Sequence, residues 1–285
     1  MLNNGTRFFM VLGLAVMIQG CAGKEALSEE KGKSTVKLRF ISWNVEYGFR
    51  ASAEEIGEFL KQWEPDVVCF NEVPGGDWTA RAGKILGMEH VHLGEISSAN
   101  HKDKYKSILS RTPLAGKKEF ILTGNGWNPA SVVRAFIEID GLRIAVYSLH
   151  ICSGSDIPEN SHSADIATRI LPQDNTPHIV VMGDFNNYID GPVMGVYRTA
   201  GFSNTWERLG IDTKKKFTCF FKEKEVITYT GSDTSAGKNY GVIDHILFNL
   251  AEDTRVIAGG IIKTEKPLSD HKPIWADIQF SGNTI

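Results

Sequence analysis

The chain has 285 residues, of which 42% are apolar and 23% are charged, and its formal net charge is −3. This composition excludes an intrinsically disordered protein and is sufficient for one large domain or two small ones. The slightly negative balance excludes a general electrostatic attraction to polyanions, although a bound metal ion can supply positive charge at a local site.

The first 20 residues have the organisation of an export signal. Arg7 lies in a short polar start, and the apolar run "FFMVLGLAVMI" that follows is too short to span a bilayer. The run ends in "IQGC", which resembles the lipidation box of bacterial lipoproteins. We therefore expect residues 1–20 to be a lipoprotein signal peptide and Cys21 to become the lipid-bearing first residue, with an ordinary signal peptide as the alternative. The protein would then be exported and lipid-anchored to a bacterial membrane, on the periplasmic side or at the cell surface.

Residues 21–35 are polar and lack periodicity, which is typical of a flexible tether, so we expect the folded domain to span residues 36–285. Cys69 lies in the apolar run "DVVCFNEV" and is expected to be a small buried side chain. Cys152 and Cys219 could form a disulfide in an oxidising compartment or stay free, because three cysteines are an odd number. No two cysteines have the sequence spacing of a zinc site.

Apolar runs typical of strands recur through this domain, with a few segments of helical periodicity between them. Helices are predicted over residues 53–63, ended by Pro65, over 77–87, ended by Gly87, and over 163–173, ended by Pro172. Strands are predicted over residues 36–45, 66–73, 105–111, 117–122, 131–151 (a hairpin that turns at Asp140-Gly141), 178–185, 242–249, 254–263 and 272–280. This order, without an internal repeat, predicts an α/β fold in which two sheets pack face to face with helices outside.

Polar side chains stand at the ends of several predicted strands. In "HIVVMGDFNN" the strand presents Asp184 and Asn186 on one side after Gly183, while Phe185 points to the other side, into the core. Similar endings in "ISWN", "CFNE", "YSLH", "VID" and "LSDH" carry Asn44, Glu72, His150, Asp244, Asp270 and His271. Each residue alone has an ordinary explanation, because Asp and Asn commonly form turns and a lone His is more often structural than catalytic.

Taken together, these strand ends predict a metal site. If they meet at one edge of the sandwich, their acids, histidines and amides form a costly cluster unless a cation neutralises it. Carboxylate and amide oxygens favour Mg²⁺ or Mn²⁺, with Ca²⁺ as a further option, and the sequence has no thiolate set for zinc. A metal ion, an oriented water and donors around a phosphate are what phosphoryl chemistry requires.

The motifs, in this order, resemble the endonuclease/exonuclease/phosphatase superfamily, whose members have the DNase I-like fold. The matching pieces are "SWN", "FNEV", "ILSR.PL", "SLH", "GDFN", "IDHIL" and "SDHKPI", which extend over nearly the whole expected domain. "GDFN" and "SDH" are fairly specific, whereas the others are weak when taken alone. The resemblance implies a four-layered α/β sandwich of two mainly antiparallel sheets, and a metal-dependent hydrolase that acts on phosphoric ester bonds.

The same resemblance implies which residues face the metal. Glu72 would be the main metal carboxylate, and Asn44 beside it would touch the metal or the phosphate. Asp270 would belong to the metal side as well. The implied cofactor is Mg²⁺ or Mn²⁺.

On the phosphate side, the resemblance assigns Asp184 to orienting or deprotonating the attacking water and Asn186 to hydrogen-bonding the phosphoryl oxygens. His271 would contact the phosphate in the transition state, with Asp244 fixing its tautomer and raising its basicity. His150 would be a second histidine on this side, at a position where some relatives have Tyr.

The sequence says less about the identity of the substrate than about the type of reaction. A phosphodiesterase or nuclease-like enzyme is favoured, while a phosphomonoesterase, a sphingomyelinase-type lipid phosphodiesterase and a non-catalytic binding lipoprotein on the same fold stay open. Residues 96–106 include Tyr105 and Lys106, which could stack on a base or bind phosphate, although a solvated polar loop is the simpler interpretation. The implied partners are a phosphate-ester substrate, which could be nucleic acid, and a membrane through the lipid anchor; no protein partner is implied.

Overall fold

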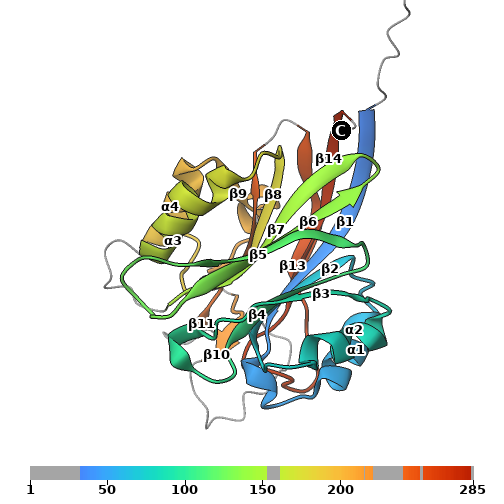
Figure 1. Cartoon of the computed structure of the whole chain (residues 1–285), viewed down its shortest axis with the longest axis vertical. Coiled ribbons are helices and arrows are strands. Elements are labelled where there is room, and N and C mark those ends of the chain that lie inside the picture. Colours follow the sequence, from blue (N-terminus) through green and yellow to red (C-terminus); the bar gives the residue numbers. More distant parts are fainter. Residues whose placement is uncertain (1–32, 153–160, 215, 221–239, 251–252, 284–285) are drawn as a thin grey trace, which may run out of the picture. The chain divides into compact units, whose positions relative to one another are not determined.

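The computed structural model describes residues 33–152, 161–214, 216–220, 240–250 and 253–283, all of which lie within a compact unit that spans Gly32–Ile285. The described part of this unit contains two six-stranded sheets, a two-stranded ribbon and flanking helices (Figure 1). Among the described residues, no helix has both the length and the apolar character needed to cross a membrane.

The first sheet combines strands from both ends of this unit. Its strands are β1 (Lys33–Asn44), β2 (Val67–Val73), β3 (His90–Leu93), β4 (Tyr105–Ser110), β13 (Thr254–Ile261) and β14 (Ile274–Asn283). Their order across the sheet is β13-β14-β1-β2-β4-β3. β1 and β2 run parallel, and the other neighbouring pairs are antiparallel.

The second sheet is built mainly from the middle of the chain. Its strands are β5 (Leu114–Ile121), β6 (Ser131–Ile139), β7 (Leu142–His150), β8 (His178–Asp184), β9 (Phe202–Asn204) and β12 (Asp244–Asn249). Their order is β5-β6-β7-β8-β12-β9, and only β7 and β8 run parallel. The separate ribbon pairs β10 (Cys219–Phe220) with β11 (Tyr240–Gly241).

The two sheets pack face to face and helices cover their outer faces. The central core lies between the sheets, where Phe40 of the first sheet and Val146 of the second belong to one buried cluster. α1 (Ala53–Lys61) and α2 (Trp78–Leu86) pack on the outer face of the first sheet. The π-helical turn η3 (Ile166–Ile170) and α4 (Pro192–Thr199) pack on the outer face of the second sheet, which completes the predicted four-layered sandwich.

Capping signals in the sequence explain the two helices on the first sheet. Ser52 caps the N-terminus of α1, where its side chain and that of Glu55 form a reciprocal capping box. α2 ends at Gly87, whose φ of 65° lies in the left-handed region that favours glycine. The predicted helices over 53–63 and 77–87 are therefore confirmed within a few residues at each end.

The helix predicted over residues 163–173 is confirmed as unbroken helical backbone over residues 161–173, but only its first part is α-helical. The structure has three short pieces there: α3 (Ser161–Asp165), η3 and the 3-10 turn η4 (Leu171–Gln173). Pro172 lies inside η4, and because proline lacks an amide hydrogen it cannot continue an α-helix. β3, β9, α4 and the four-residue α5 (Thr205–Arg208) are not predicted, since short elements give too little periodicity to detect.

The strand directions bring several polar strand ends to one edge of the sandwich. In the parallel pairs, Asn44 aligns with Asn71, and His150 aligns with Asp184. β12 runs antiparallel to β8 and begins at the same edge, because Asp244 aligns with Asp184. The two sheets thus place their polar ends next to one another, and Asp270 and His271 reach the same edge from the connection before β14.

A glycine permits the close approach of β7 and β8 at this edge. Gly183 has a φ of 151°, and a Cβ at this position would lie 1.9 Å from the carbonyl oxygen of Leu149. A larger residue would push the strands apart just before Asp184. Cys152 and Cys219 are free, buried thiols, so the disulfide left open by the sequence does not form between them.

Candidate active site

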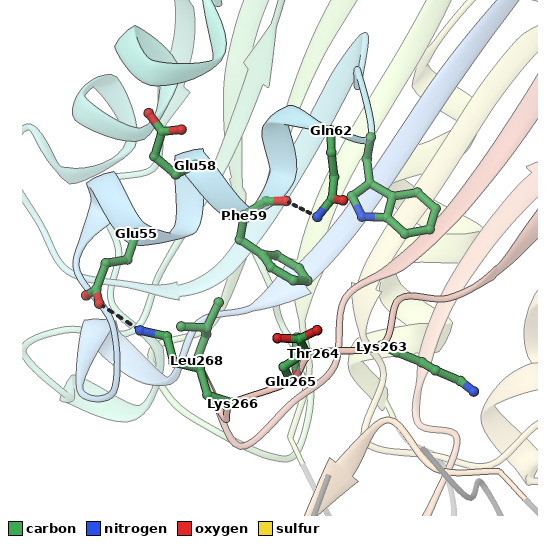
Figure 2. A pocket seen from close by; sticks show the side chains of 10 residues that line it. Glu55, Glu58, Phe59, Gln62, Lys263, Thr264, Glu265, Lys266 and Leu268 are labelled. Atoms are coloured by element: carbon green, nitrogen blue, oxygen red, sulfur yellow. Dashed lines mark hydrogen bonds and ion pairs between the residues drawn. The ribbon is translucent and has the colours of Figure 1, made fainter. Parts of the chain in front are cut away.

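Two places in the described residues could serve as a functional site, and one is a cavity of about 860 Å³ beside α1 (Figure 2). Phe59, Trp63 and Leu268 are among its lining residues, and at its rim Lys266 forms an ion pair with Glu55 at 3.2 Å. The cavity contains none of the predicted site residues. Its apolar lining and solvent-exposed rim charges do not converge on a point where a bond could be broken, so we do not assign the chemistry to it.

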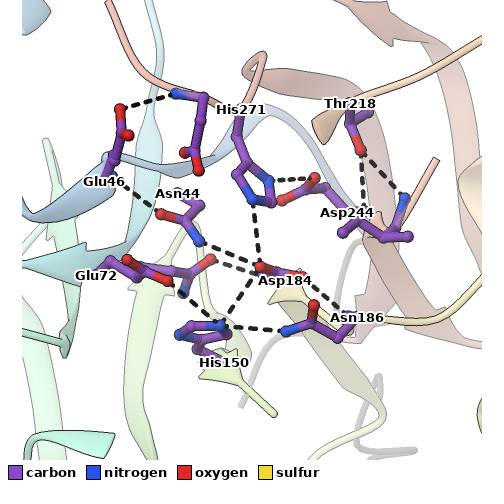
Figure 3. A network of polar contacts seen from close by, with 12 residues as sticks. Asn44, Glu46, Glu72, His150, Asp184, Asn186, Thr218, Asp244 and His271 are labelled. Carbon is purple, nitrogen blue, oxygen red and sulfur yellow. Dashed lines mark hydrogen bonds and ion pairs between the residues drawn. The ribbon is translucent and has the colours of Figure 1, made fainter. Parts of the chain in front are cut away.

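The other place is the edge of the sandwich where the polar strand ends meet (Figure 3). All of the predicted catalytic and metal residues lie at this edge, which we call the strand-end cluster: Asn44, Glu72, His150, Asp184, Asn186, Asp244, Asp270 and His271. Most are almost completely buried, with exposed fractions of 2% or less at Asn44, His150, Asp184 and Asp244. Their convergence agrees with the site that the sequence predicts.

Asp184 lies at the centre of the strand-end cluster. Its Oδ1 accepts a hydrogen bond from the backbone N–H of Asn186 at 2.8 Å, and its Oδ2 accepts one from Asn44 Nδ2 at 3.1 Å. The same Oδ2 lies 3.4 Å from His150 Nε2 and 3.6 Å from His271 Nε2. Burial raises the pKa of the Asp184 carboxyl, and the charge of His271 only partly opposes this effect.

His271 and Asp244 form a close ion pair. His271 Nδ1 lies 2.9 Å from Asp244 Oδ2, which leaves Nε2 facing Asp184. Burial alone would lower the pKa of the imidazole, but the charges of Asp244, Cys219 and Asp184 together with the hydrogen bond to Asp244 outweigh it and hold the pKa well above its ordinary value. His271 is therefore cationic at neutral pH. The indole N–H of Trp43 donates to the His271 carbonyl at 2.9 Å and holds this backbone in place.

A β-bulge turns Glu72 toward the cluster. The register between β2 and β4 shifts between Asn71 and Val73, and Glu72 in the bulge has a φ of 50°. Its Oε1 lies 3.7 Å from His150 Nε2 and accepts a hydrogen bond from Lys104 Nζ at 2.9 Å. The Glu72 carboxylate is thus already paired with the ammonium group of Lys104.

His150 is neutral in this setting. Burial lowers the pKa of its imidazole to about 3, even though Glu72 acts in the opposite direction. Asn186 Nδ2 donates to the carbonyl of Ile151 at 2.9 Å and lies 3.3 Å from His150 Nε2, which suits an unprotonated ring nitrogen. The Trp127 ring packs edge-on against the imidazole with the ring centroids 4.7 Å apart.

The structure adds Glu46, which the sequence analysis missed, to the metal side. Glu46 is buried and its Oε2 accepts a hydrogen bond from the backbone N–H of Asp270 at 3.1 Å. Burial raises the pKa of both carboxyls; the charge of Asp270 further raises the pKa of Glu46, and the charge of Glu72 further raises the pKa of Asp270. Arg50 forms an ion pair with Glu46. Glu46 begins a 3-10 turn just after β1, so the period-two pattern of a strand does not extend to it.

The weakly predicted substrate contacts, Tyr105 and Lys106, lie away from the cluster's polar centre. Lys106 is completely buried, and its ammonium donates to the Ile96 carbonyl at 2.9 Å and to Ser98 Oγ at 3.3 Å. Burial lowers its pKa to about 8. Tyr105 packs against the apolar core of the first sheet. The structure instead brings Lys104 to Glu72 from the same segment.

Of the eight non-glycine residues with left-handed backbone in the described part of the chain, four lie at the cluster. Glu46, Tyr47, Glu72 and Asn186 all have φ between 45° and 50°. Each such conformation costs of the order of 1–3 kcal/mol and persists only where the surrounding structure holds it. The strain therefore points to a site that is fixed for a purpose other than packing.

The chain is similar to known proteins in its sequence and in its fold. A model of the Endonuclease/Exonuclease/phosphatase family matches residues 41–271 of the chain. No curated protein sequence gives a significant match. Among solved structures, the fold is similar to an endonuclease/exonuclease/phosphatase from Beutenbergia cavernae DSM 12333, with 18% identity, a TM-score of 0.66, and coverage of 87% of this chain and 72% of that one.

Two further structures show the same likeness of fold. The human Nocturnin catalytic domain with bound sulfate has 15% identity and a TM-score of 0.65, with coverage of 87% of this chain and 97% of that one. The D. rerio TDP2 structure, complexed with a single-strand DNA product, has 17% identity and a TM-score of 0.60, with coverage of 85% and 98%.

Proposed function

Because the chain belongs to the endonuclease/exonuclease/phosphatase family, we propose that it is a divalent-metal-dependent phosphoesterase that hydrolyses phosphodiesters by in-line attack of an activated water. One observation carries the proposal: Glu72, Asp184 and His271, far apart in the sequence, converge in one buried polar cluster. A metal carboxylate, a carboxylate that orients water and a cationic phosphate contact are the groups that phosphoryl transfer needs.

The charge balance of the strand-end cluster fits a divalent cation. Its carboxylates are Glu46, Glu72, Asp184, Asp244 and Asp270, and the cationic groups that contact them are Arg50, Lys104 and His271. When all five carboxyls are ionised, about two negative charges are uncompensated, which is costly in a buried setting and is consistent with the raised pKa values of Glu46, Asp184 and Asp270. In addition, Asp244 Oδ1 is buried without a hydrogen-bond partner among the described residues.

The donor chemistry then indicates which ion would bind. Glu72, Asn44 and Asp270 offer carboxylate and amide oxygens, which favour Mg²⁺ or Mn²⁺, with Ca²⁺ as a further option. When bound, the ion would polarise a phosphoryl oxygen as a Lewis acid. Lys104 Nζ donates a hydrogen bond to Glu72 Oε1. Lys104 would therefore either share this oxygen with the ion or move away from it.

Asp184 is placed to orient or deprotonate the attacking water. Both of its oxygens are fixed by hydrogen bonds from Asn44 and Asn186, so its free lone pairs have a defined direction. A raised pKa makes its carboxylate a better base than an exposed Asp. Asn186 Nδ2 already donates one hydrogen to Ile151, and its second hydrogen would turn from His150 to a phosphoryl oxygen.

His271 would contact the phosphate as a cation. Asp244 keeps the imidazole protonated and in one orientation, so Nε2–H can stabilise charge on a phosphoryl oxygen or give a proton to the leaving oxygen. His150 would act as a neutral hydrogen-bonding group beside Glu72 and Asp184.

An aromatic surface beside the metal side favours a nucleic-acid or nucleotide ester as substrate. Phe49 is 69% exposed, and its ring lies 5.9 Å from that of Tyr47, which in turn lies 5.6 Å from His101. Exposed aromatic rings commonly stack on unpaired bases. The TDP2 structure with a single-strand DNA product has the same fold. A phosphomonoester or a sphingomyelin-type lipid is the alternative substrate.

We also propose that the protein is an exported lipoprotein. The support is the "IQGC" motif alone, and both residues 1–20 and Cys21 lie outside the described residues. Metabolic labelling with a radioactive fatty acid in a bacterial host tests this proposal. Label should enter the full chain and be lost in Cys21→Ala; label in neither protein would leave an ordinary signal peptide.

A substrate panel tests the enzymatic proposal. The full chain, purified in detergent, would be incubated with DNA, RNA, bis-p-nitrophenyl phosphate, p-nitrophenyl phosphate, sphingomyelin and inositol phosphates, each with Mg²⁺, with Mn²⁺ and with chelator. Metal-dependent cleavage of a diester, lost in Glu72→Ala and in His271→Ala, is the expected result. Binding of DNA without turnover of any ester would instead support a non-catalytic binding protein.

A further inference from the structure

We propose that Cys219, Asp270 and His271 form a binding site for Zn²⁺ or another thiophilic divalent ion, and that this ion inhibits the enzyme. The three residues each offer one donor atom, a thiol sulfur, a carboxylate oxygen and a ring nitrogen, and these atoms all lie within 4.8 Å of one another. Thiolate, imidazole and carboxylate are the three ligand types that Zn²⁺ uses in proteins. The sequence analysis missed this site, because Cys219 lies about fifty residues from the other two.

The backbone holds the thiol and the imidazole side by side. Cys219 and His271 form an isolated antiparallel β-bridge, and side chains of directly opposed residues lie on the same face. The neighbouring pair supports this bridge, because the N–H of Lys272 donates to the Thr218 carbonyl at 2.7 Å. Cys219 is 4% exposed and His271 is 5% exposed, so the donor atoms have little freedom to separate.

In metal-binding histidines, the ring nitrogen that does not bind the metal usually makes a hydrogen bond. His271 already makes such a bond. Its Nδ1 is held by Asp244, which leaves Nε2 as the nitrogen available to a metal. A carboxylate on the far nitrogen fixes the ring orientation and makes the near nitrogen a stronger ligand. Asp184 Oδ2, 3.6 Å from Nε2, offers a possible fourth donor.

The thiol gives this site a different metal preference from that of the Glu72 side. Mg²⁺, Mn²⁺ and Ca²⁺ favour oxygen ligands, whereas Zn²⁺ accepts sulfur and nitrogen readily. Coordination would release the thiol proton and the Nε2 proton of His271 to the buffer, since thiolate and neutral imidazole are the metal-binding forms. A cell-surface or periplasmic enzyme with this site would lose activity when free zinc rises.

The inhibitory effect rests on the proposed function, in which His271 must contact the phosphate as a cation. A metal on Nε2 would occupy the atom that faces the phosphate and would remove its proton. The binding itself does not depend on any catalytic role. Direct metal titration and inhibition of turnover therefore test two separate statements.

Cobalt provides the direct test of binding. Co²⁺ bound to a thiolate gives a near-ultraviolet charge-transfer band that oxygen and nitrogen ligands do not give. The full chain in detergent, with excess Mg²⁺, is titrated with Co²⁺ and then with Zn²⁺ as competitor. We expect the band in the unaltered protein, its loss on adding Zn²⁺, and its absence in Cys219→Ser.

Cys152→Ser is the matched control, because Cys152 is also a buried free thiol but is not part of the three-residue group. This variant should keep the cobalt band. Asp270→Asn provides a second test if Cys219→Ser does not fold, and it should weaken Zn²⁺ binding at least about tenfold, as loss of even an outer-shell partner does. A missing band in the unaltered protein, or a band that Cys152→Ser removes, would overturn the proposal.

Inhibition is measured on whichever ester the substrate panel identifies. Cys219→Ser should keep its Mg²⁺-dependent rate, and its half-inhibitory Zn²⁺ concentration should rise at least about tenfold. Equal inhibition of the two proteins, together with a cobalt band, would leave the metal site standing and refute the inhibitory role. If no ester is cleaved, the cobalt band still decides whether the site exists.

Discussion

Replacing Asp244 by Asn tests whether its charge keeps His271 protonated. Asp244→Asn preserves the shape of the side chain but removes the negative charge whose Oδ2 lies 2.9 Å from His271 Nδ1. A hydrogen bond to a charged group contributes about 1.5–3 kcal/mol, and about 1.36 kcal/mol corresponds to one pKa unit. We therefore expect the pKa of His271 to fall by about one to two units.

The assay is the pH dependence of kcat/KM for phosphodiester hydrolysis with saturating Mg²⁺. In the proposed mechanism the protonated imidazole is the active form, so activity should fall as pH rises through the raised pKa of His271. In Asp244→Asn this alkaline limb should move about one to two pH units lower. An unchanged alkaline limb, with turnover and fold intact, would refute the idea that Asp244 acts through the charge of His271.

The same substitution should also change how the free energy of unfolding depends on pH. Proton linkage fixes the direction of this change. The pKa of His271 is raised in the folded state, so the stabilisation by its charge is complete below the ordinary imidazole pKa of about 6.5 and is lost as pH rises through the raised pKa. The difference in unfolding free energy between the two proteins should therefore shrink toward alkaline pH. Asp174→Asn is the control: Asp174 accepts a partly buried hydrogen bond from Tyr147, so the change should lower stability without moving the activity profile.

Three further predictions concern the same edge of the sandwich. Glu72→Gly removes the proposed metal carboxylate but suits the φ of 50°, so kcat/KM should fall more than about a hundredfold while unfolding in urea without metal shows no loss of stability. Gly183→Ala places a Cβ against the Leu149 carbonyl, and urea unfolding should show a loss of more than about 2 kcal/mol; an unchanged midpoint would contradict the close approach. Lys104→Met removes the cation that competes for Glu72, so calorimetry should show tighter Mg²⁺ or Mn²⁺ binding, and weaker binding would mean that Lys104 helps to hold the ion's ligands.

The sequence predicts much of the site because each site residue follows an apolar run. "IVVMGDFN" and "YSLH" show where a buried strand ends and which polar side chain comes next. Parallel neighbours then bring such ends together, as the alignment of His150 with Asp184 confirms. The prediction therefore needs only local patterns and the rule that strand ends of one sheet meet at an edge.

The residues that the sequence analysis missed depend on geometry without a local pattern. The β-bulge that turns Glu72 toward Lys104 depends on how β2 pairs with β4, strands that are more than thirty residues apart. The contact between Cys219 and His271 depends on a single backbone bridge between distant segments. Lys106 looked accessible because its segment is polar, yet the loop folds over it and uses its ammonium as an internal donor.

Stability alone does not account for this edge of the fold. Left-handed backbone at Glu46, Glu72 and Asn186 opposes folding by about 1–3 kcal/mol at each residue. Glycine at these positions would relieve that cost, and apolar side chains would remove the buried charge at Asp184 and Asp244. The chain keeps acidic and amide groups there instead, all aimed at one another across two sheets. A cation and an anionic substrate, as proposed above, would balance these buried charges, so the proposed phosphoester chemistry explains the cluster better than packing does.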